Sequence, residues 1–228
     1  MSHDRGALYV VATPIGNMKD ITLRALEVLK ESNFILCEDT RKTMKIMSHY
    51  NISGPKLLSY NEHNENKRIP EVVKLLREGN TISLVCNAGT PTIQDPGYRL
   101  IKLLKEEGFK VLPVPGPSAL IAALSVSGLP TNRFIFYGFL PRKKGKRESL
   151  YREWIEEEMT VIFYESPKRI RKIFKEIKSH KEFENRRVFI AREMTKKFES
   201  YTLLLIKNVD VEDLPEKGEY VVILEGKR

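Results

Sequence analysis

The residues best suited to chemistry lie in two stretches rich in Gly and Pro, residues 87–97 and residues 115–119. Gly89 lets a ligand approach the backbone closely, because glycine has no side chain to block it. Two prolines stiffen the first stretch, since a proline ring fixes its own φ. Ser118 lies in the second stretch, where a hydroxyl can cap the following helix or bind a ligand. These residues predict a rigid small-molecule pocket whose specificity the two stretches alone leave open.

Several common catalytic motifs are absent from the sequence. No G-x-G-x-x-G follows the first apolar run, which argues against a common dinucleotide fold. The glycines at 138 and 145, followed by Lys146 and Arg147, do not match a P-loop, and no G-x-S-x-G marks a hydrolase. Four histidines and two separated cysteines show no metal-ligand spacing. We therefore expect no metal site.

Alternating strand and helix patterns must position these stretches. Apolar runs of strand length alternate with helical patterns through the first half, and Thr22 is placed to cap the first helix. Strands that are apolar throughout are typical of a parallel sheet that is covered on both faces. The five runs are residues 7–12, 34–37, 57–60, 81–86 and 110–113.

In a parallel sheet the loops that leave the strands share one edge, where ligands bind. Five loops rich in Gly, Pro, Asn and charge leave these strands, and we expect them to form one site. His63 lies in one of them, and both a ligand-binding and a merely solvated histidine remain open. The loops are residues 13–17, 38–41, 61–66, 87–96 and 115–118.

The second half has a different pattern, with strands at residues 134–137, 160–164 and 187–191 and a small-residue helix at 117–127. Its last strands are joined by a polar connection, so the sheet is expected to turn antiparallel. The sequence therefore predicts two α/β domains, residues 1–114 with a mainly parallel sheet and residues 115–228 with a mixed sheet.

Composition limits the class of protein. The chain has 228 residues, of which 41% are hydrophobic and 30% charged, a balance typical of a globular protein rather than a disordered one. No apolar run approaches the roughly 20 residues of a membrane span. Cys37 and Cys86 lie in apolar runs, as expected of buried thiols in a reducing compartment, so we expect a cytoplasmic protein. The formal net charge of +9 is compatible with a polyanionic partner.

Ten stretches, in order along nearly the whole chain, resemble the ribosomal RNA small subunit methyltransferase I family of the tetrapyrrole-methylase superfamily. The resemblance implies S-adenosylmethionine-dependent methylation of a cytidine 2′-hydroxyl in small-subunit ribosomal RNA. It also implies a homodimer of two α/β domains with the methyl donor between them. The stretches are residues 13–17, 38–41, 62–64, 88–91, 95–97, 115–119, 138–141, 163–167, 191–197 and 217–219.

The resemblance also assigns residues to the methyl donor and shows where this chain departs from the family. Asn87 stands where the family commonly has Asp, Ala12 stands where Gly is usual, and many members extend further at the C-terminus. The residues expected around S-adenosylmethionine are Pro14, Gly89, Thr90, Pro91, Ile93, Ser118, Ala119 and Tyr164.

Methyl transfer to a hydroxyl needs the two reactants held in line and benefits from a nearby base or cation. We expect Arg41 and Lys196 to contact the substrate phosphate or oxyanion, and Glu193 to act as the base. A structural ion pair is the alternative for each, and for Asp39, Glu165 and Arg192, the other candidates.

Five of the six residues from 142 to 147 are basic, and they follow a strand. We expect a flexible loop that contacts RNA phosphates through Arg142, Lys143, Lys144, Lys146 and Arg147. The acceptor is then small-subunit ribosomal RNA or the assembled subunit. Two alternatives are a tetrapyrrole methyltransferase and a non-catalytic RNA-binding factor in ribosome assembly.

Overall fold

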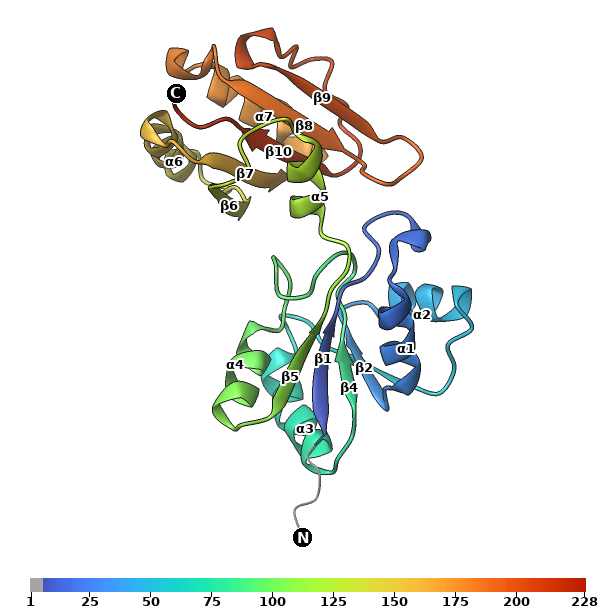
Figure 1. Ribbon diagram of the computed structural model, residues 1–228. Coiled ribbons are helices and arrows are strands. Elements are labelled where there is room, and N and C mark those ends of the chain that lie inside the picture. Colours follow the sequence, from blue (N-terminus) through green and yellow to red (C-terminus); the bar gives the residue numbers. More distant parts are fainter. Residues whose placement is uncertain (1–5) are drawn as a thin grey trace. The chain divides into compact units, whose positions relative to one another are not determined.

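A computed structural model describes residues 6–228 of the chain (Figure 1). The chain divides into two units, one ending at Ser118 and one spanning Ala119–Arg228. The sequence placed the boundary after residue 114, at the end of a strand, whereas the connecting residues 115–118 pack with the first unit. The expected fold class is confirmed, with a parallel sheet in the first unit and a mixed sheet in the second.

The first unit contains a five-stranded sheet in the order β3-β2-β4-β1-β5, and every neighbouring pair is parallel. Leu8, Ile35, Leu36 and Ile82 in its strands are fully buried, which explains why these strands are apolar throughout. The strands are β1 (Ala7–Val11), β2 (Phe34–Cys37), β3 (Lys56–Ser59), β4 (Ile82–Leu84) and β5 (Lys110–Val114).

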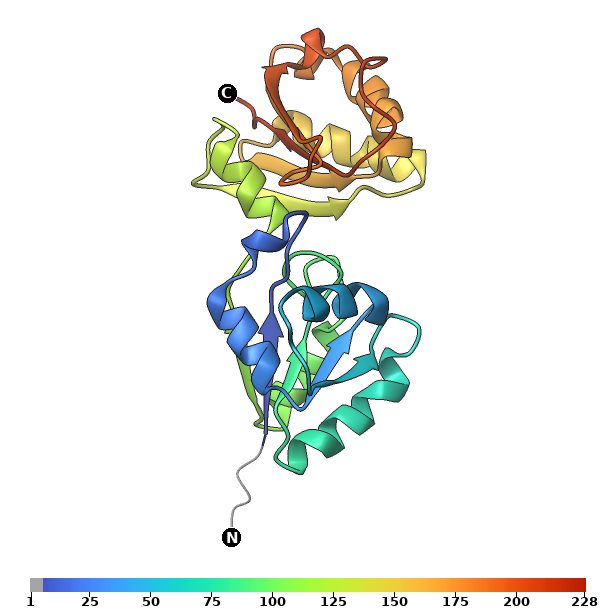
Figure 2. The ribbon, with the colours of Figure 1, turned by 90° about the vertical axis from the view of Figure 1, so that its right-hand side faces the viewer.

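Helices cover both faces of this sheet (Figure 2). Helices α3 (Glu65–Arg77) and α4 (Tyr98–Glu106) pack on one face, and α1 (Leu23–Glu31) and α2 (Thr40–His49) pack on the other. Thr22 caps α1 as predicted, because its side chain accepts a hydrogen bond from the backbone N–H of Ala25 at 3.1 Å. A short 3₁₀ helix, Met18–Asp20, precedes α1.

The second unit contains a five-stranded sheet in the order β6-β7-β10-β8-β9. The pair β6–β7 is parallel and the remaining pairs are antiparallel, as the polar connections of the sequence predicted. The strands are β6 (Phe134–Phe139), β7 (Thr160–Glu165), β8 (Arg187–Arg192), β9 (Ser200–Leu205) and β10 (Tyr220–Leu224).

Three α-helices belong to the described part of the second unit: α5 (Ala119–Val126), α6 (Lys144–Glu156) and α7 (Pro167–Lys178). Short 3₁₀ helices span Lys181–Phe183 and Ile206–Asn208. The expectation of a flexible loop over residues 142–147 is wrong from Lys144 onward, because α6 begins there. Only three residues of α6 are buried, Arg147, Tyr151 and Trp154, so its apolar stripe is too narrow to stand out in the sequence.

None of the helices within residues 6–228 combines the length and apolar character that a membrane crossing requires.

Candidate functional site

The loops predicted to form a site leave the first sheet at one edge, because all five strands run parallel. The loop after β1 is joined to the loop after β4 by two backbone hydrogen bonds between Thr13 and Gly89, at 2.8 and 2.9 Å. Gly89 has a φ of +84°, a conformation that favours glycine. The Thr90 hydroxyl donates to the Pro117 carbonyl at 3.1 Å, which ties the loop after β5 to the same wall.

Six of the eight residues expected around the methyl donor lie in these three connected loops. Pro14, Gly89 and Pro91 are buried, Thr90 and Ser118 are half-buried, and Ile93 is 44% exposed. The other two belong to the second unit. There the Tyr164 hydroxyl accepts a hydrogen bond from the backbone N–H of Leu120 at 3.1 Å, beside Ala119 at the start of α5.

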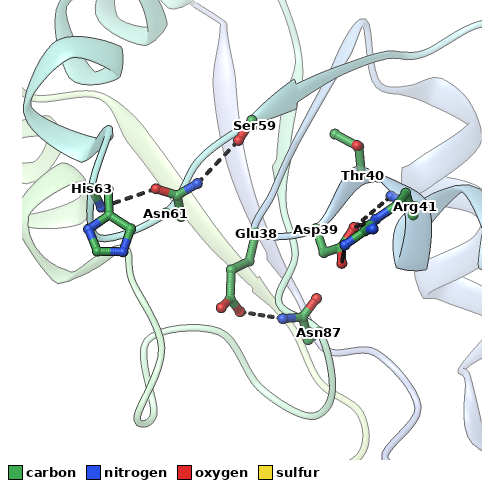
Figure 3. Close-up of a pocket in the computed structure, with 8 residues that line it drawn as sticks. All are labelled: Glu38, Asp39, Thr40, Arg41, Ser59, Asn61, His63 and Asn87. Carbon is green, nitrogen blue, oxygen red and sulfur yellow. Dashed lines mark hydrogen bonds and ion pairs between the residues drawn. The ribbon is translucent and has the colours of Figure 1, made fainter.

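A polar pocket of about 350 Å³ opens at the same edge of the first sheet (Figure 3). It is formed by Ser59, the last residue of β3, and by residues that follow β2, β3 and β4. Arg41 and Asp39 were expected at a site and His63 was left open. Glu38, Thr40 and Asn61 lie in loops that were expected at the site, and Asn87 was noted as a departure from the family. Ser59 was not anticipated. The pocket is lined by Glu38, Asp39, Thr40, Arg41, Ser59, Asn61, His63 and Asn87.

Arg41 is held at this pocket by a two-pronged ion pair with Asp39. Its Nε donates to Asp39 Oδ1 at 3.0 Å, and its Nη2 donates to Oδ2 at 2.8 Å. Asp39 also caps α2 by accepting from the backbone N–H of Arg41 at 2.9 Å. These contacts with Arg41 lower the pKa of the Asp39 carboxyl to about 2. The Arg41 side chain remains 87% exposed, so its guanidinium faces solvent while it bonds to Asp39.

Asn87 stands where the resemblance led us to expect Asp, and its hydrogen-bond partner explains why an amide is found there. Its Nδ2 donates to Glu38 Oε2 at 2.6 Å. An aspartate in this place would set a second negative charge against Glu38, whereas the amide satisfies the carboxylate without charge repulsion.

Asp95, in the loop after β4, is a half-buried carboxyl. Burial raises its pKa to about 6, the thiol of Cys86 offsets this in part, and the charges of Glu38 and Glu62 raise it further. Burial likewise raises the pKa of Cys86 to about 12, so the thiol stays protonated.

We expect the variant Asp95→Asn to stabilise the protein near neutral pH. An unfolded aspartate titrates at about 3.9, so the folded state binds more protons than the unfolded state between about pH 4 and pH 6. The contribution of Asp95 to the free energy of unfolding therefore falls as pH rises through this window. Asparagine does not titrate, so the variant does not lose this stability. The expected gain is up to about 2–3 kcal/mol at about pH 8 and near zero at about pH 4. Urea unfolding of both proteins at the two pH values measures it, and an equal difference at both would contradict the assignment.

Glu193 and Lys196 lie in one loop after β8 and bond to each other. Lys196 Nζ lies 2.8 Å from Glu193 Oε1 and 2.7 Å from Glu219 Oε2. Contact with Lys196 lowers the pKa of Glu193. For Lys196, burial acts to lower the pKa, but the two carboxylates outweigh it and raise the pKa. Glu193 and Thr195 have φ values of +52° and +63°. Such conformations are strained in residues other than glycine and cluster at functional sites.

Two other charged candidates have structural partners. Glu165 is buried, accepts from the backbone N–H of Ser166 at 2.7 Å, and lies 3.3 Å from Arg169. Burial raises its pKa. Arg192 donates to the carbonyls of Lys217 and Phe198. These contacts favour the structural alternative for both residues.

The basic residues at the start of α6 divide into two groups. Arg142, Lys143, Lys144 and Lys146 are exposed. Arg147 corrects the expectation of a phosphate contact, because its side chain is 1% exposed and forms an ion pair with Glu176 at 2.6 Å. The helix turns this one residue inward beside Tyr151 and Trp154.

Among residues 6–228, no group of three or more His, Cys, Asp or Glu side chains could hold a metal ion.

Comparison with known proteins places the chain in a family. The family model for tetrapyrrole (corrin/porphyrin) methylases matches residues 7–210. The chain is 45% identical to a ribosomal RNA small subunit methyltransferase I of Thermotoga maritima, over 97% of this chain and 99% of the relative. It is 44% identical to the enzyme of that name from Escherichia coli O157:H7, over 99% of this chain and 80% of the relative.

Solved structures of lower identity share the fold. A cobalt precorrin-4 methyltransferase superposes with a TM-score of 0.71 at 19% identity, covering 96% of this chain and 94% of that one. A uroporphyrin-III-C-methyltransferase of Thermus thermophilus gives a TM-score of 0.63, also at 19% identity, with the same coverage. The chain therefore belongs to the ribosomal RNA small subunit methyltransferase I family of the tetrapyrrole methylases, and it is a methyltransferase.

Proposed function

We propose that this protein transfers a methyl group from S-adenosylmethionine to the 2′-hydroxyl of a cytidine in small-subunit (16S) ribosomal RNA. The observation that carries the proposal is the similarity at 44–45% identity, over nearly the whole chain, to proteins named ribosomal RNA small subunit methyltransferase I. The acceptor is small-subunit ribosomal RNA, either as naked RNA or in the assembled subunit. The expected location is the cytoplasm.

The connected loops of the first unit suit the methyl donor. They combine buried prolines with an exposed apolar side chain at Ile93, and Gly89 supplies the positive φ at which the loop after β4 is bonded to the loop after β1. We assign the donor to Pro14, Gly89, Thr90, Pro91, Ile93 and Ser118, with Ala119 and Tyr164 from the second unit. When bound, S-adenosylmethionine supplies a methyl group activated by its sulfonium.

The charged residues have separate roles in this proposal. In the transfer a bond forms between the ribose oxygen and the methyl carbon, the carbon–sulfur bond breaks, and the hydroxyl proton leaves to a base. Glu193 is the proposed base because its backbone has a φ of +52°, a strained conformation that clusters at functional sites, and its carboxylate is ionised. Contact with Lys196 lowers its pKa and so makes it a weaker base than an unperturbed glutamate. Lys196 is the proposed partner of the developing oxyanion, and Arg41 that of a substrate phosphate.

The RNA backbone is assigned to the exposed basic residues Arg142, Lys143, Lys144 and Lys146. A homodimer is also part of the proposal. Exposed apolar side chains on α5 and β9 support it, among them Ile121, Val126 and Leu203, which are 52%, 60% and 44% exposed.

A tetrapyrrole acceptor is the second candidate, because the solved structures with this fold are named for such substrates. Their 19% identity carries the fold alone, whereas the RNA-methyltransferase relatives are more than twice as similar. The third candidate, an RNA-binding assembly factor without activity, predicts no donor binding.

One experiment separates the three functions. Calorimetry with S-adenosylmethionine is followed by incubation of the protein and labelled donor with small subunits that lack modification, or with a tetrapyrrole. We expect donor binding, label in the RNA, and a single labelled cytidine on mapping. Label only in the tetrapyrrole would support the second candidate, and absence of donor binding would support the third.

A further inference from the structure

We propose that the polar pocket of the first unit receives the cytosine base of the acceptor nucleotide, and that Glu38 reads its amino group. The inference rests on the proposed function, which names the reaction but not the residues that select the base. The pocket volume of about 350 Å³ lies within the range of small-molecule sites, about 300–1,000 Å³. Its lining is polar, which suits a nucleobase edge better than an apolar ligand.

Glu38 provides a hydrogen-bond acceptor that is already oriented. Its Oε2 accepts from Asn87 Nδ2 at 2.6 Å, while Oε1 accepts no hydrogen bond from any residue between 6 and 228. A carboxylate oxygen matches the exocyclic amino group of cytosine, which donates. Uracil carries a carbonyl oxygen at the same place. This oxygen is an acceptor like the carboxylate, so the two would repel each other instead of forming a hydrogen bond. The pocket therefore distinguishes cytidine from uridine.

Two planar groups stand at the sides of this acceptor. In Figure 3 the Glu38–Asn87 pair lies between His63 and Arg41. Unpaired bases are commonly held by stacking on histidine rings or guanidinium planes. Arg41 is fixed by Asp39, and the backbone N–H of His63 donates to the Asn61 side chain at 3.0 Å.

The position of the pocket also suits an acceptor. Asn87 begins the loop that contains Gly89, Thr90 and Pro91, the residues assigned to the methyl donor. A base held against Glu38 and Asn87 therefore lies beside the donor loop within the same unit.

The test is Glu38→Gln. Asn87 continues to donate to the glutamine carbonyl, so the new amide N–H₂ faces the base in place of the carboxylate. It donates, which suits uracil and repels the amino group of cytosine. Methyl transfer is measured on small subunits reconstituted with either cytidine or uridine at the modified position. We expect cytidine methylation to fall about tenfold or more and the preference to shift toward uridine.

Two variants and one binding measurement complete the test. Glu27→Gln removes an exposed carboxylate of α1 outside the pocket and is expected to leave the ratio of cytidine to uridine unchanged. His63→Ala is expected to lower both activities together, because stacking tolerates either base. Calorimetry with S-adenosylmethionine is expected to give wild-type affinity for Glu38→Gln.

The possible outcomes separate this inference from the proposed function. If the wild-type protein methylates no RNA, both are wrong. If the wild type methylates a cytidine while Glu38→Gln retains its cytidine preference, or loses both activities equally, the proposed function stands and the base-reading role of Glu38 is overturned.

Discussion

Replacement of Arg147 by alanine is expected to destabilise the second unit by about 3–5 kcal/mol, the cost of removing one partner of a buried ion pair. Arg147 Nε and Nη2 donate to the two oxygens of Glu176 at 2.7 and 2.6 Å. Its Nη1 donates to the carbonyls of Pro141 and Arg142 at 2.9 and 2.6 Å. With the side chain 1% exposed, water cannot replace these four hydrogen bonds.

The loss is large because Glu176 would keep its charge in a buried place. Burial alone would raise the pKa of Glu176, yet Arg147 and the Tyr151 hydroxyl hold it below its usual value. Without Arg147 the carboxylate retains only the bond from Tyr151, at 3.1 Å. It must then either remain charged without its bonded counter-ion or take up a proton, and both lower the stability of the fold.

Urea unfolding measures the effect, with Lys146→Ala as the matched control. Lys146 is the preceding residue of the same helix and is exposed, so its removal is expected to change stability by less than about 0.5 kcal/mol. Equal stabilities for the two variants would show that the buried pair contributes nothing.

Much of the first unit could be predicted because each of its strands can be recognised from its own short run of apolar residues. The apolar run at residues 7–12 became β1, Ala7–Val11, since a strand buried on both faces has no reason to alternate polar and apolar residues. Thr22 could be placed as a cap for a similar reason, because its hydrogen bond spans only three residues. The edge of the sheet that carries the loops followed from the parallel order alone.

The features that escaped prediction depend on distant contacts. Glu38 and Asn87 meet because β2 and β4 are neighbours in the sheet, although β3 lies between them in sequence. A run of basic residues likewise does not reveal which member turns inward. Arg147 is turned inward because it lies on the same face of α6 as Tyr151, four residues further on, and because Glu176 on α7 accepts its hydrogen bonds.

The second large effect concerns the exposed members of that same run. Simultaneous replacement of Arg142, Lys143, Lys144 and Lys146 by glutamine is expected to weaken RNA binding and to flatten its dependence on salt. Each lost phosphate contact removes about 0.7–0.9 from the slope of log affinity against log salt concentration, so four contacts remove up to about 3.6. All four residues are exposed and Arg147 remains in place, so folding should be unaffected.

A matched quadruple variant separates local contact from overall charge. Lys30, Lys56, Lys102 and Lys110 are exposed residues of the first unit, and their replacement by glutamine changes the net charge equally. Binding of small-subunit RNA is titrated at several salt concentrations, and donor affinity is measured by calorimetry. The slope should fall much further for the α6 variant than for the control, with donor affinity unchanged in both. Equal slopes would mean that the general charge of +9, rather than this segment, attracts the RNA.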